Sequence, residues 1–324
     1  MRALKRIVKS AVRASGAERL WLRHRASNPT ILMYHGVTVN EPRGIENCDG
    51  KHVHITRFRE QLAILKAYRR VLPLSELVDG VVRGEDMRNA VAITFDDGFE
   101  NNLVHAADVL SEHKASATFF LATGYIGTDR WMWVDRLEFA IDRYAREELE
   151  LSFLGRISTR DKRAALRQIK AHCKRLPEAE LQALLAEVEQ RTGSDTAPPL
   201  GDYRFMSWAQ VQELKAAGFE IGAHTVNHPI LSRVNVERAE SEMLQSRDHI
   251  KKELGSCSEV FCYPNGKFSD YTPEVMQAAA RHFSAALATN RGPARSSERY
   301  EMRRIGVGYE TTSDDFVHML IREQ

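Results

Sequence analysis

Short apolar runs alternate with amphipathic stretches along most of the chain, and the two patterns have different periods. The apolar runs are typical of buried strands, whereas the stretches between them repeat apolar residues at helical spacing. Alternating strands and helices favour βα units and a parallel sheet, so the pattern predicts an α/β fold. Strands are expected at 30–35, 91–95, 117–122, 219–223, 259–263 and 284–288, with a shorter one near 304–308.

Local signals mark several helix ends. Ser207 and Gln210 form a capping box, and Gly218 ends the helix that follows them. A second helix is expected at 237–254, closed by the glycine at 255.

Residues 131–205 interrupt the alternation with a charged, helix-rich stretch. Leucine and valine follow helical spacing after Pro177, and the stretch ends in a loop that contains Pro198 and Pro199. We interpret it as an insertion between two strands of one domain at 29–324, where it forms a wall of the substrate groove. Its polarity predicts that it holds little core of its own.

Composition adds three constraints. A chain of 324 residues with 43% hydrophobic content can bury a substantial core. The 46 basic and 44 acidic side chains nearly cancel, which gives no electrostatic reason to expect nucleic-acid binding. The four cysteines have no metal-type spacing and fit a reducing compartment.

The first 28 residues differ from the rest because they are basic and amphipathic. Residues 1–25 carry eight Lys or Arg side chains against Glu18 alone, and Leu4 and Ile7 begin an apolar face at helical spacing. Such a helix either lies on an anionic membrane surface or packs on the domain. No apolar run is long enough for a signal peptide or a membrane span. We therefore expect a cytoplasmic protein with peripheral contact to the inner face of the membrane through residues 1–25.

Two neighbouring carboxylates, Asp96 and Asp97, follow the apolar run at 91–95 and precede Gly98. Adjacent side chains on a strand point to opposite faces, so the two acids can share a site only where the strand ends and the backbone turns. Such a pair suits metal chemistry, in which one carboxylate binds the ion and the other takes a proton from water. An ordinary Asp-Gly turn is the alternative.

Two further strand ends carry candidate groups. The strand at 219–223 leads into His224 and His228, and two neutral imidazoles with a carboxylate are the usual ligand set of a hydrolytic zinc site. The strand at 259–263 leads into the turn Y-P-N-G. Candidate groups at equivalent ends of several strands are hard to attribute to chance.

T-F-D-D-G, H-T-x-x-H and Y-P-x-G, in this order and each after a strand, resemble the motifs of the polysaccharide deacetylase family, also called the NodB-homology family or carbohydrate esterase family four. The resemblance covers about residues 29–310, and the Y-H-x-V opening strand is similar to that of the exopolysaccharide (poly-N-acetylglucosamine) deacetylases. It implies a distorted (β/α) barrel of about seven parallel strands with a helical insertion. It also implies hydrolysis of N-acetyl groups on amino sugars of a polysaccharide or a lipid-linked oligosaccharide.

By this resemblance, Asp97, His224 and His228 hold a divalent metal, and Asp96 is the general base. Zn²⁺ suits two imidazoles and a carboxylate best, although Fe²⁺, Co²⁺ and Ni²⁺ are accommodated by the same set.

The resemblance also assigns the remaining roles. The backbone N–H of Asn265 stabilises the oxyanion of the tetrahedral intermediate. The family's usual C-terminal L-x-H acid is missing, and in the similar branch the histidine of the Y-H-x-V strand, here His35, protonates the leaving amine. Four side chains are expected to contact the glycan: Tyr263, Pro264, Trp131 and Trp133. The alternative for the two tryptophans is a core position, which is more usual for aromatic residues at the start of a helix.

One departure from the family pattern concerns the partner of Asp96. Much of the family has an arginine in the third motif that pairs with this aspartate, and Cys262 stands in its place. Either Arg303 or Arg304 reaches the aspartate from another direction, or the branch works without the ion pair. A nucleophilic role for Cys262 is the weaker interpretation, because metal-activated water already fills that role.

Two other functions stay open. The same ion and base would hydrolyse a small cyclic or formyl amide, and only the groove distinguishes such an amidase from a glycan deacetylase. A glycan-binding barrel that has lost its chemistry is the second, but a binding protein has no need of a base beside a metal triad.

Overall fold

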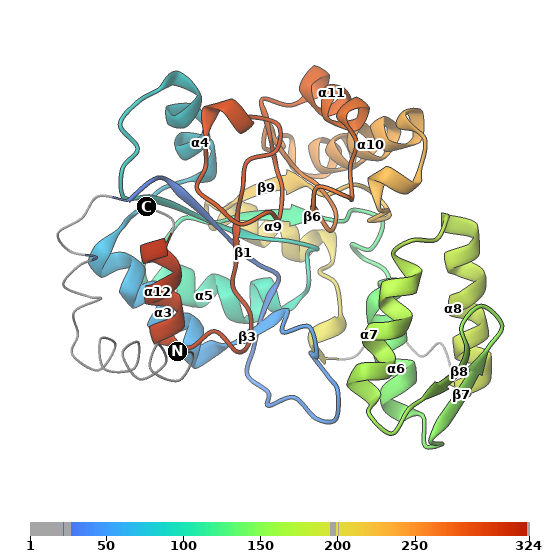
Figure 1. Cartoon of the computed structure of the whole chain (residues 1–324). Helices are drawn as coiled ribbons and strands as arrows, with labels where there is room; N and C mark the ends of the chain where they lie inside the picture. The colour runs from blue at the N-terminus through green and yellow to red at the C-terminus, as the bar shows by residue number, and fades with distance from the viewer. Residues whose placement is uncertain (1–21, 23–26, 195–198, 200, 323–324) are drawn as a thin grey trace, which may run out of the picture.

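A parallel sheet curved into a barrel forms the centre of the molecule, in a computed structural model that describes residues 22, 27–194, 199 and 201–322 (Figure 1). The strand order is β11, β10, β9, β6, β5, β1, β12, with β4 paired to β5. The strands of this sheet are β1 (Thr30–Tyr34), β4 (Arg70–Val71), β5 (Ala90–Phe95), β6 (Thr118–Leu121), β9 (Glu220–Ala223), β10 (Val260–Cys262), β11 (Ala285–Leu287) and β12 (Ile305–Gly306). An isolated parallel bridge pairs Leu287 of β11 with Met302, three residues before β12.

The predicted distorted (β/α) barrel is therefore confirmed, and each of the seven expected strands is present. The two-residue β4 was not expected, nor was the small parallel pair of β2 (Gly36–Thr38) and β3 (His52–His54). Both are too short to produce a period that a sequence pattern can reveal.

Helices cover the two faces of the sheet unequally: α3, α5, α9, α10, α11 and α12 pack into the cluster on one face, and α4 packs into the cluster on the other. Ser207 caps α9 in the expected capping box with Gln210. The helices around the sheet are α3 (Ile55–Tyr68), α4 (Leu74–Arg83), the π-helix Asn102–Ala107, α5 (Asp108–Glu112), α9 (Trp208–Ala216), α10 (Val236–Leu254), α11 (Pro273–His282) and α12 (Ser313–Arg322).

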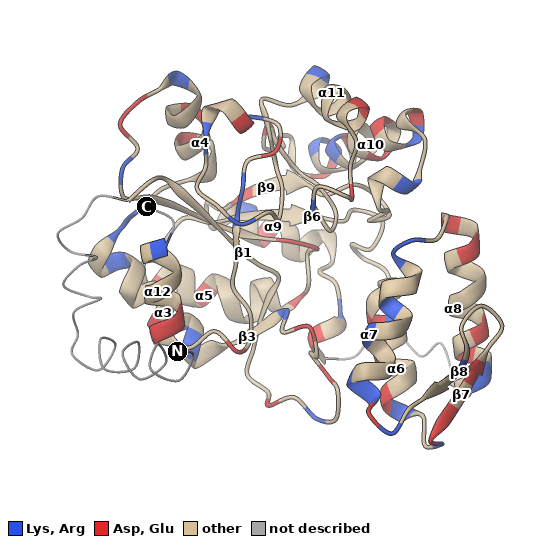
Figure 2. Ribbon diagram, in the orientation of Figure 1, with Lys and Arg blue, Asp and Glu red and all other residues tan. Residues whose placement is uncertain are grey.

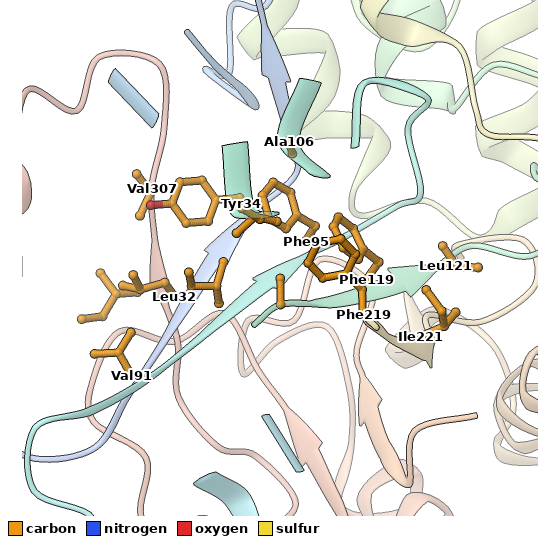
Figure 3. Packing of buried hydrophobic residues seen from close by; sticks show 14 of the residues in the cluster. Leu32, Tyr34, Val91, Phe95, Ala106, Phe119, Leu121, Phe219, Ile221 and Val307 are labelled. Carbon is orange, nitrogen blue, oxygen red and sulfur yellow. The ribbon is translucent and has the colours of Figure 1, made fainter. Parts of the chain in front are cut away.

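The main core lies between the sheet and the helices of one side, and aromatic rings connect neighbouring strands within it (Figure 3). Tyr34, Phe95 and Phe119 come from β1, β5 and β6 and are fully buried. The Phe95 ring stacks on Tyr34 at 5.3 Å and on Phe119 at 5.0 Å. Burial of each such ring stabilises the fold by about 1.5 to 3 kcal/mol. The strand ends that follow these rings are thus held on a rigid scaffold.

The segment between β6 and α9 folds beside the barrel as three helices and a hairpin (Figure 1). Its elements are α6 (Trp133–Arg143), β7 (Glu148–Leu151), β8 (Gly155–Ser158), α7 (Lys162–Cys173) and α8 (Glu178–Thr192). It has a hydrophobic cluster of its own that includes Leu137, Leu166 and Leu184. The expectation that this segment holds little core is wrong: its helices carry many charged residues (Figure 2), but their apolar positions meet in a cluster inside the segment.

Two ion pairs connect this insertion to the barrel, one buried and one with an exposed carboxylate. The Lys51 ammonium contacts Asp135 of α6, and the two side chains are 10% and 1% exposed. Lys170 of α7 contacts Asp49 at 2.7 Å. Removal of one partner of such a buried pair leaves an uncompensated charge, so these contacts fix the insertion relative to the strand ends.

The predicted N-terminal amphipathic segment, residues 1–28, lies almost wholly outside the described residues. Leu22 is described, and its side chain is buried in the main core. Within the described part of the chain, no helix combines the length and the apolar content needed to cross a bilayer.

Candidate active site

The candidate residues follow strands that end at the same edge of the sheet. Tyr34 of β1 pairs in register with Phe95 of β5, so His35 and Asp96 are the next residues on parallel neighbouring strands. His224 follows β9, whose last residue, Ala223, pairs with Phe261 of β10. This is the edge at which parallel barrels place their active sites.

Asp97, His224 and His228 converge on one point. The Asp97 Oδ1 atom lies 3.6 Å from His224 Nε2 and 3.4 Å from His228 Nε2. One donor atom from each residue lies within 4.8 Å of the other two. Among the described residues, Asp97 Oδ1 has no hydrogen-bond partner although it is buried. A divalent cation would satisfy this oxygen, so the residues present fit a metal ion.

The two imidazoles are in the state that metal binding requires. Burial lowers the pKa of His224 to about 4 and that of His228 to about 3, so both rings are neutral at pH 7. The contacts with Asp97 are therefore not ion pairs. His224 Nδ1 donates to the Cys262 carbonyl at 2.8 Å, which leaves the Nε2 lone pair facing Asp97.

Unusual backbone conformations are concentrated in this site. Asp97, Thr225, His228 and Asn265 have φ angles of 76°, 66°, 54° and 57°. Positive φ is rare for side chains other than glycine and is a true outlier for β-branched Thr225. Such strain persists only where surrounding contacts enforce it, and it is most frequent at functional sites. The loops that carry the metal-type donors are thus held in place by their surroundings.

Glu242 of α10 supplies the contacts that hold the His228 loop, and the motifs did not predict this role. One carboxylate oxygen accepts the N–H groups of Val226 at 2.9 Å and Asn227 at 2.8 Å. The other oxygen accepts hydrogen bonds from the side-chain amide of Asn227, at 2.9 Å, and from the Arg238 guanidinium. Its only sequence signal is a carboxylate on the buried stripe of an amphipathic helix, beside Ala239 and Met243.

Arg304 is the partner of Asp96. Its guanidinium donates to both carboxylate oxygens, at 2.8 and 2.7 Å, and is completely buried. Burial acts to raise the pKa of Asp96, but the charge and hydrogen bonds of Arg304 outweigh it and hold that pKa far below its usual range. Arg303 instead binds Glu298 at 2.7 Å. Arg304, and not Arg303, therefore takes the place of the family's third-motif arginine.

Cys262 is part of this pair rather than a nucleophile. Arg304 donates to its sulfur at 3.1 Å, and the side chain is fully buried. Burial raises the pKa of the thiol well above its ordinary value, so the reactive thiolate is suppressed. Asp96, His224 and Cys262 also form a metal-type group by geometry. The guanidinium already neutralises that group and would repel a second cation.

His35 lies at the candidate edge and is half-buried. Its carbonyl accepts a hydrogen bond from Asn102 at 2.8 Å, which fixes the turn after β1. The His35 imidazole also lowers the pKa values of Asp96 and His228. For Asp96 its effect is smaller than those of burial, Arg304 and His224, and for His228 it is smaller than those of burial and Asp96. The next residue, Gly36, has no room for a side chain, because a Cβ there would lie 2.3 Å from His52.

The third-motif turn departs from part of the prediction. One part agrees with it: among the described residues the Asn265 backbone N–H makes no hydrogen bond, so it is available to an oxyanion. Tyr263 is fully buried, stacks on Tyr271 at 4.4 Å and donates its hydroxyl to the Tyr300 carbonyl at 2.9 Å. The predicted contact of Tyr263 with substrate is therefore wrong, because its side chain belongs to the core. Pro264 is also buried, so it shapes the turn instead of offering a contact surface.

The two tryptophans lie at the start of the insertion, and both line a pocket with His228. Trp131 is half-buried and packs near Phe139 and Tyr203, whereas Trp133 is 8% exposed and joins the cluster of the insertion.

Comparison with known proteins decides the family. A family model described as polysaccharide deacetylase matches residues 83–283, which is more than half of the chain. The chain belongs to the polysaccharide deacetylase family. The resemblance inferred from the motifs is thus confirmed, and with it the coarse activity of a polysaccharide deacetylase. No curated protein matches this sequence.

Solved structures show the same fold as this polysaccharide deacetylase at low identity. The Streptococcus pyogenes deacetylase PplD, in complex with acetate, is 20% identical, with a TM-score of 0.59 over 91% of this chain and 99% of that chain. IcaB from Ammonifex degensii is 17% identical, with a TM-score of 0.61 over 91% and 97%. A de-N-acetylase from Aggregatibacter actinomycetemcomitans is 14% identical, with a TM-score of 0.57 over 90% and 99%.

Proposed function

We propose that this deacetylase is a metal-dependent hydrolase that removes N-acetyl groups from amino sugars of a glycan. The observation that carries the proposal is the buried Asp97 oxygen, which has no partner among the described residues and lies between two neutral imidazoles. Beside it, Arg304 keeps Asp96 ionised. Asp97, His224 and His228 would hold a divalent cation, with Zn²⁺ as the first choice, and the bound ion would supply Lewis-acid chemistry for the acetyl carbonyl and the attacking water.

The residues of the chain divide the remaining work. Asp96 accepts a proton from the attacking water, and Arg304 keeps its carboxylate oriented and charged. The Asn265 N–H donates to the oxyanion that forms on the acetyl carbon. His35 gives a proton to the amine as the C–N bond breaks, which leaves acetate and a free amino sugar.

The decisive experiment measures acetate released from N-acetylglucosamine oligosaccharides by purified, Zn²⁺-loaded protein. We expect Asp96→Asn to reduce turnover by about 10² to 10⁴-fold, the usual contribution of a general base, while bound metal is retained. Asp248→Asn, which changes an exposed carboxylate of α10, is the matched control and should leave turnover unchanged.

The alternatives give different results in the same assay. An amidase for small cyclic or formyl amides would release product from those amides and none from the oligosaccharides. A glycan-binding barrel would bind the oligosaccharides without releasing acetate, whatever metal is supplied.

The N-terminal segment carries a separate proposal, membrane association on the cytoplasmic side. It rests on the basic amphipathic pattern of residues 1–25. Co-sedimentation with anionic liposomes should be strong for the full chain and weak for a chain that lacks these residues, and equal sedimentation would end this idea.

A further inference from the structure

Three segments of the chain meet beside the candidate active site, and each contributes an exposed cation. Arg233 is on the segment after His228, and Lys267 is on the segment after Asn265. Lys174, at the end of α7, belongs to the insertion. The Arg233 Nε atom donates to the Lys174 carbonyl at 3.4 Å, so the insertion contacts the barrel at this junction.

The two barrel segments of this junction are bound to each other. The Ser232 backbone N–H donates to the Asp270 carbonyl at 2.9 Å, and the Ser232 hydroxyl donates to the Ser269 carbonyl at 2.7 Å. Arg233 and Lys267 flank these bonds in the chain. The backbone that carries the three cations is therefore held together by hydrogen bonds at both contacts.

The cations of the junction are not neutralised by acids. Among the described residues, none of the side chains of Lys174, Arg233 and Lys267 forms an ion pair. Asp270 is part of the junction, but its carboxylate already accepts the Lys267 backbone N–H at 3.0 Å and the Ser269 hydroxyl at 3.1 Å. Three cations thus share the junction with one carboxylate, and the local charge is positive.

Lys174 and Lys267 repel each other. The surrounding segments partly desolvate Lys174 and Lys267 adds a like charge, and both effects lower the pKa of the Lys174 ammonium. Asp270 and Asp49 act in the opposite direction without cancelling this effect. A helix dipole stabilises a lysine at a helix C-terminus, which accounts for Lys174 but not for a second cation in its field. Repulsion between like charges costs free energy, and a bound anion would offset that cost.

A phosphate group suits this junction better than a carboxylate does. Two ammonium groups and a guanidinium come from three directions in the chain, so the ligand needs several oxygens that point to different sides. Phosphate has such oxygens, and both lysine and arginine bind it, lysine as a point charge and arginine through parallel N–H donors. A carboxylate offers two oxygens on one side and is matched by a single guanidinium.

We propose that Lys174, Arg233 and Lys267 bind a phosphate group beside the reaction centre. The phosphate belongs either to the glycan, as a sugar phosphate or phosphodiester, or to a lipid headgroup. Binding of phosphate does not depend on the proposed deacetylase function. Its use to select a phosphate-bearing substrate does rest on that function, because the phosphate then lies on the molecule that loses its acetyl group.

The first test compares Lys174→Gln, Lys267→Gln and the double variant with the wild-type full chain, loaded with Zn²⁺. The probes are N-acetylglucosamine and its short oligomers, each with and without a 1-phosphate. The measured quantity is the ratio of kcat/KM with the phosphate to kcat/KM without it. In the wild type this ratio should exceed one for at least one length, through KM. It should fall when NaCl is raised from about 10 to about 150 mM, because salt screens exposed charges.

Each single variant should lower the ratio by about 3- to 5-fold and the double variant by about 10-fold, as expected for contacts of exposed charges. Lys267→Arg keeps the positive charge and should keep the ratio. Lys252→Gln, which changes an exposed lysine of α10, is the matched control.

The second test distinguishes the two sources of phosphate. It measures binding of the full-length wild type and double variant to vesicles of phosphatidylcholine with phosphatidic acid, so residues 1–25 contribute equally to both proteins. Weaker vesicle binding by the double variant would assign the phosphate to a lipid headgroup. Equal vesicle binding with a reduced kinetic ratio would assign it to the glycan.

Broadening of the ³¹P signal of N-acetylglucosamine 1-phosphate measures binding without turnover. If the wild type broadens this signal and the double variant does not, but no acetate is released from any probe, the phosphate site stands and the proposed function fails. If acetate is released but the double variant matches the wild type in the kinetic ratio, the ³¹P signal and vesicle binding, the proposed function stands and the phosphate site fails. If no acetate is released and the double variant matches the wild type in the other two assays, both fail.

Discussion

At the scale of single residues, Arg304 determines the ionisation state of Asp96, the proposed general base. Its two hydrogen bonds to Asp96 are formed without any exposure to solvent. A carboxylate in that position without a partner would take up a proton instead of remaining charged. The arginine therefore keeps the base both ionised and correctly oriented.

Replacing Arg304 by Met should destabilise the protein by about 3 to 5 kcal/mol, because the buried Asp96 charge loses its partner. The folded-state pKa of Asp96 is depressed, so the ion pair contributes stability above the unfolded pKa of about 3.9 and loses it as pH falls toward the folded value. In the variant that pKa rises, and the acidic limb of the kcat/KM profile moves to higher pH. Urea unfolding and pH–rate profiles measure both effects. Arg303→Met, which removes only the half-exposed pair with Glu298, should change neither the profile nor the stability by more than about 1 kcal/mol.

A second prediction concerns His35. We expect His35→Ala to reduce deacetylation by about 10² to 10⁴-fold, because the leaving amine loses its proton donor. Metal content should stay at the wild-type value, since the three metal-type donors are elsewhere. Metal analysis and kcat on the same preparation test this, with His113→Ala at the end of α5 as control. Full activity in the variant would assign the acid to another residue.

The sequence selected Asp96, Asp97, His224 and His228 as candidates because they follow strands in motif order, and the structure brings them together. It did not settle the partner of Asp96, because Arg304 is 208 residues distant and its neighbour Arg303 has the same chemistry. Only the twist of the chain near β12 decides which guanidinium enters the barrel. Tyr263 was misjudged for a related reason, since a tyrosine at a strand end has the same pattern whether it packs inward or outward.

At the scale of elements, α10 positions the loop after β9. Its Glu242 accepts two backbone N–H groups from that loop, and the loop keeps Thr225 and His228 at positive φ. The helix thus acts on the metal-type site without contacting it, as outer-shell groups do in other metal proteins.

Glu242→Gln keeps the size of the side chain but removes its charge, which weakens the hydrogen bonds that hold the loop. We expect Zn²⁺ affinity to fall by about 10 to 100-fold, with kcat restored by excess metal. Competition with a chromogenic chelator measures the affinity, and Glu237→Gln, a change of an exposed carboxylate on the same helix, is the control. A defect that excess Zn²⁺ does not rescue would mean that Glu242 supports the fold alone.

The strands and most helices could be predicted from the sequence because their buried apolar residues recur at the spacing typical of each element. The insertion shows where that reasoning fails. Counting its charges predicted little core, yet helices such as α8 alternate charged outward positions with Leu181, Leu184 and Leu185 facing inward. The hairpin of β7 and β8 is too short and too charged to resemble a strand pair in the sequence.

At the scale of the whole molecule, metal binding and stability should be linked. A ligand at 100 times its Kd adds about 2.7 kcal/mol to the free energy of unfolding. Chelation should therefore abolish acetate release and lower Tm, and added Zn²⁺ should restore both. The Asp97→Ala protein should show no Zn²⁺-dependent change in Tm. A Zn²⁺ shift that persists in that variant would place the metal elsewhere.

Arg304 stands just before β12, the last strand of the sheet along the chain, and this order has a consequence during synthesis. Metal-type donors from β5 and β9 emerge from the ribosome well before the guanidinium that prepares the base. A nascent or C-terminally truncated chain could therefore capture an ion while still unable to cleave an amide. If Asp96 is the base as proposed, hydrolysis would require β12 to have joined the sheet, so only the complete barrel would cleave the amide.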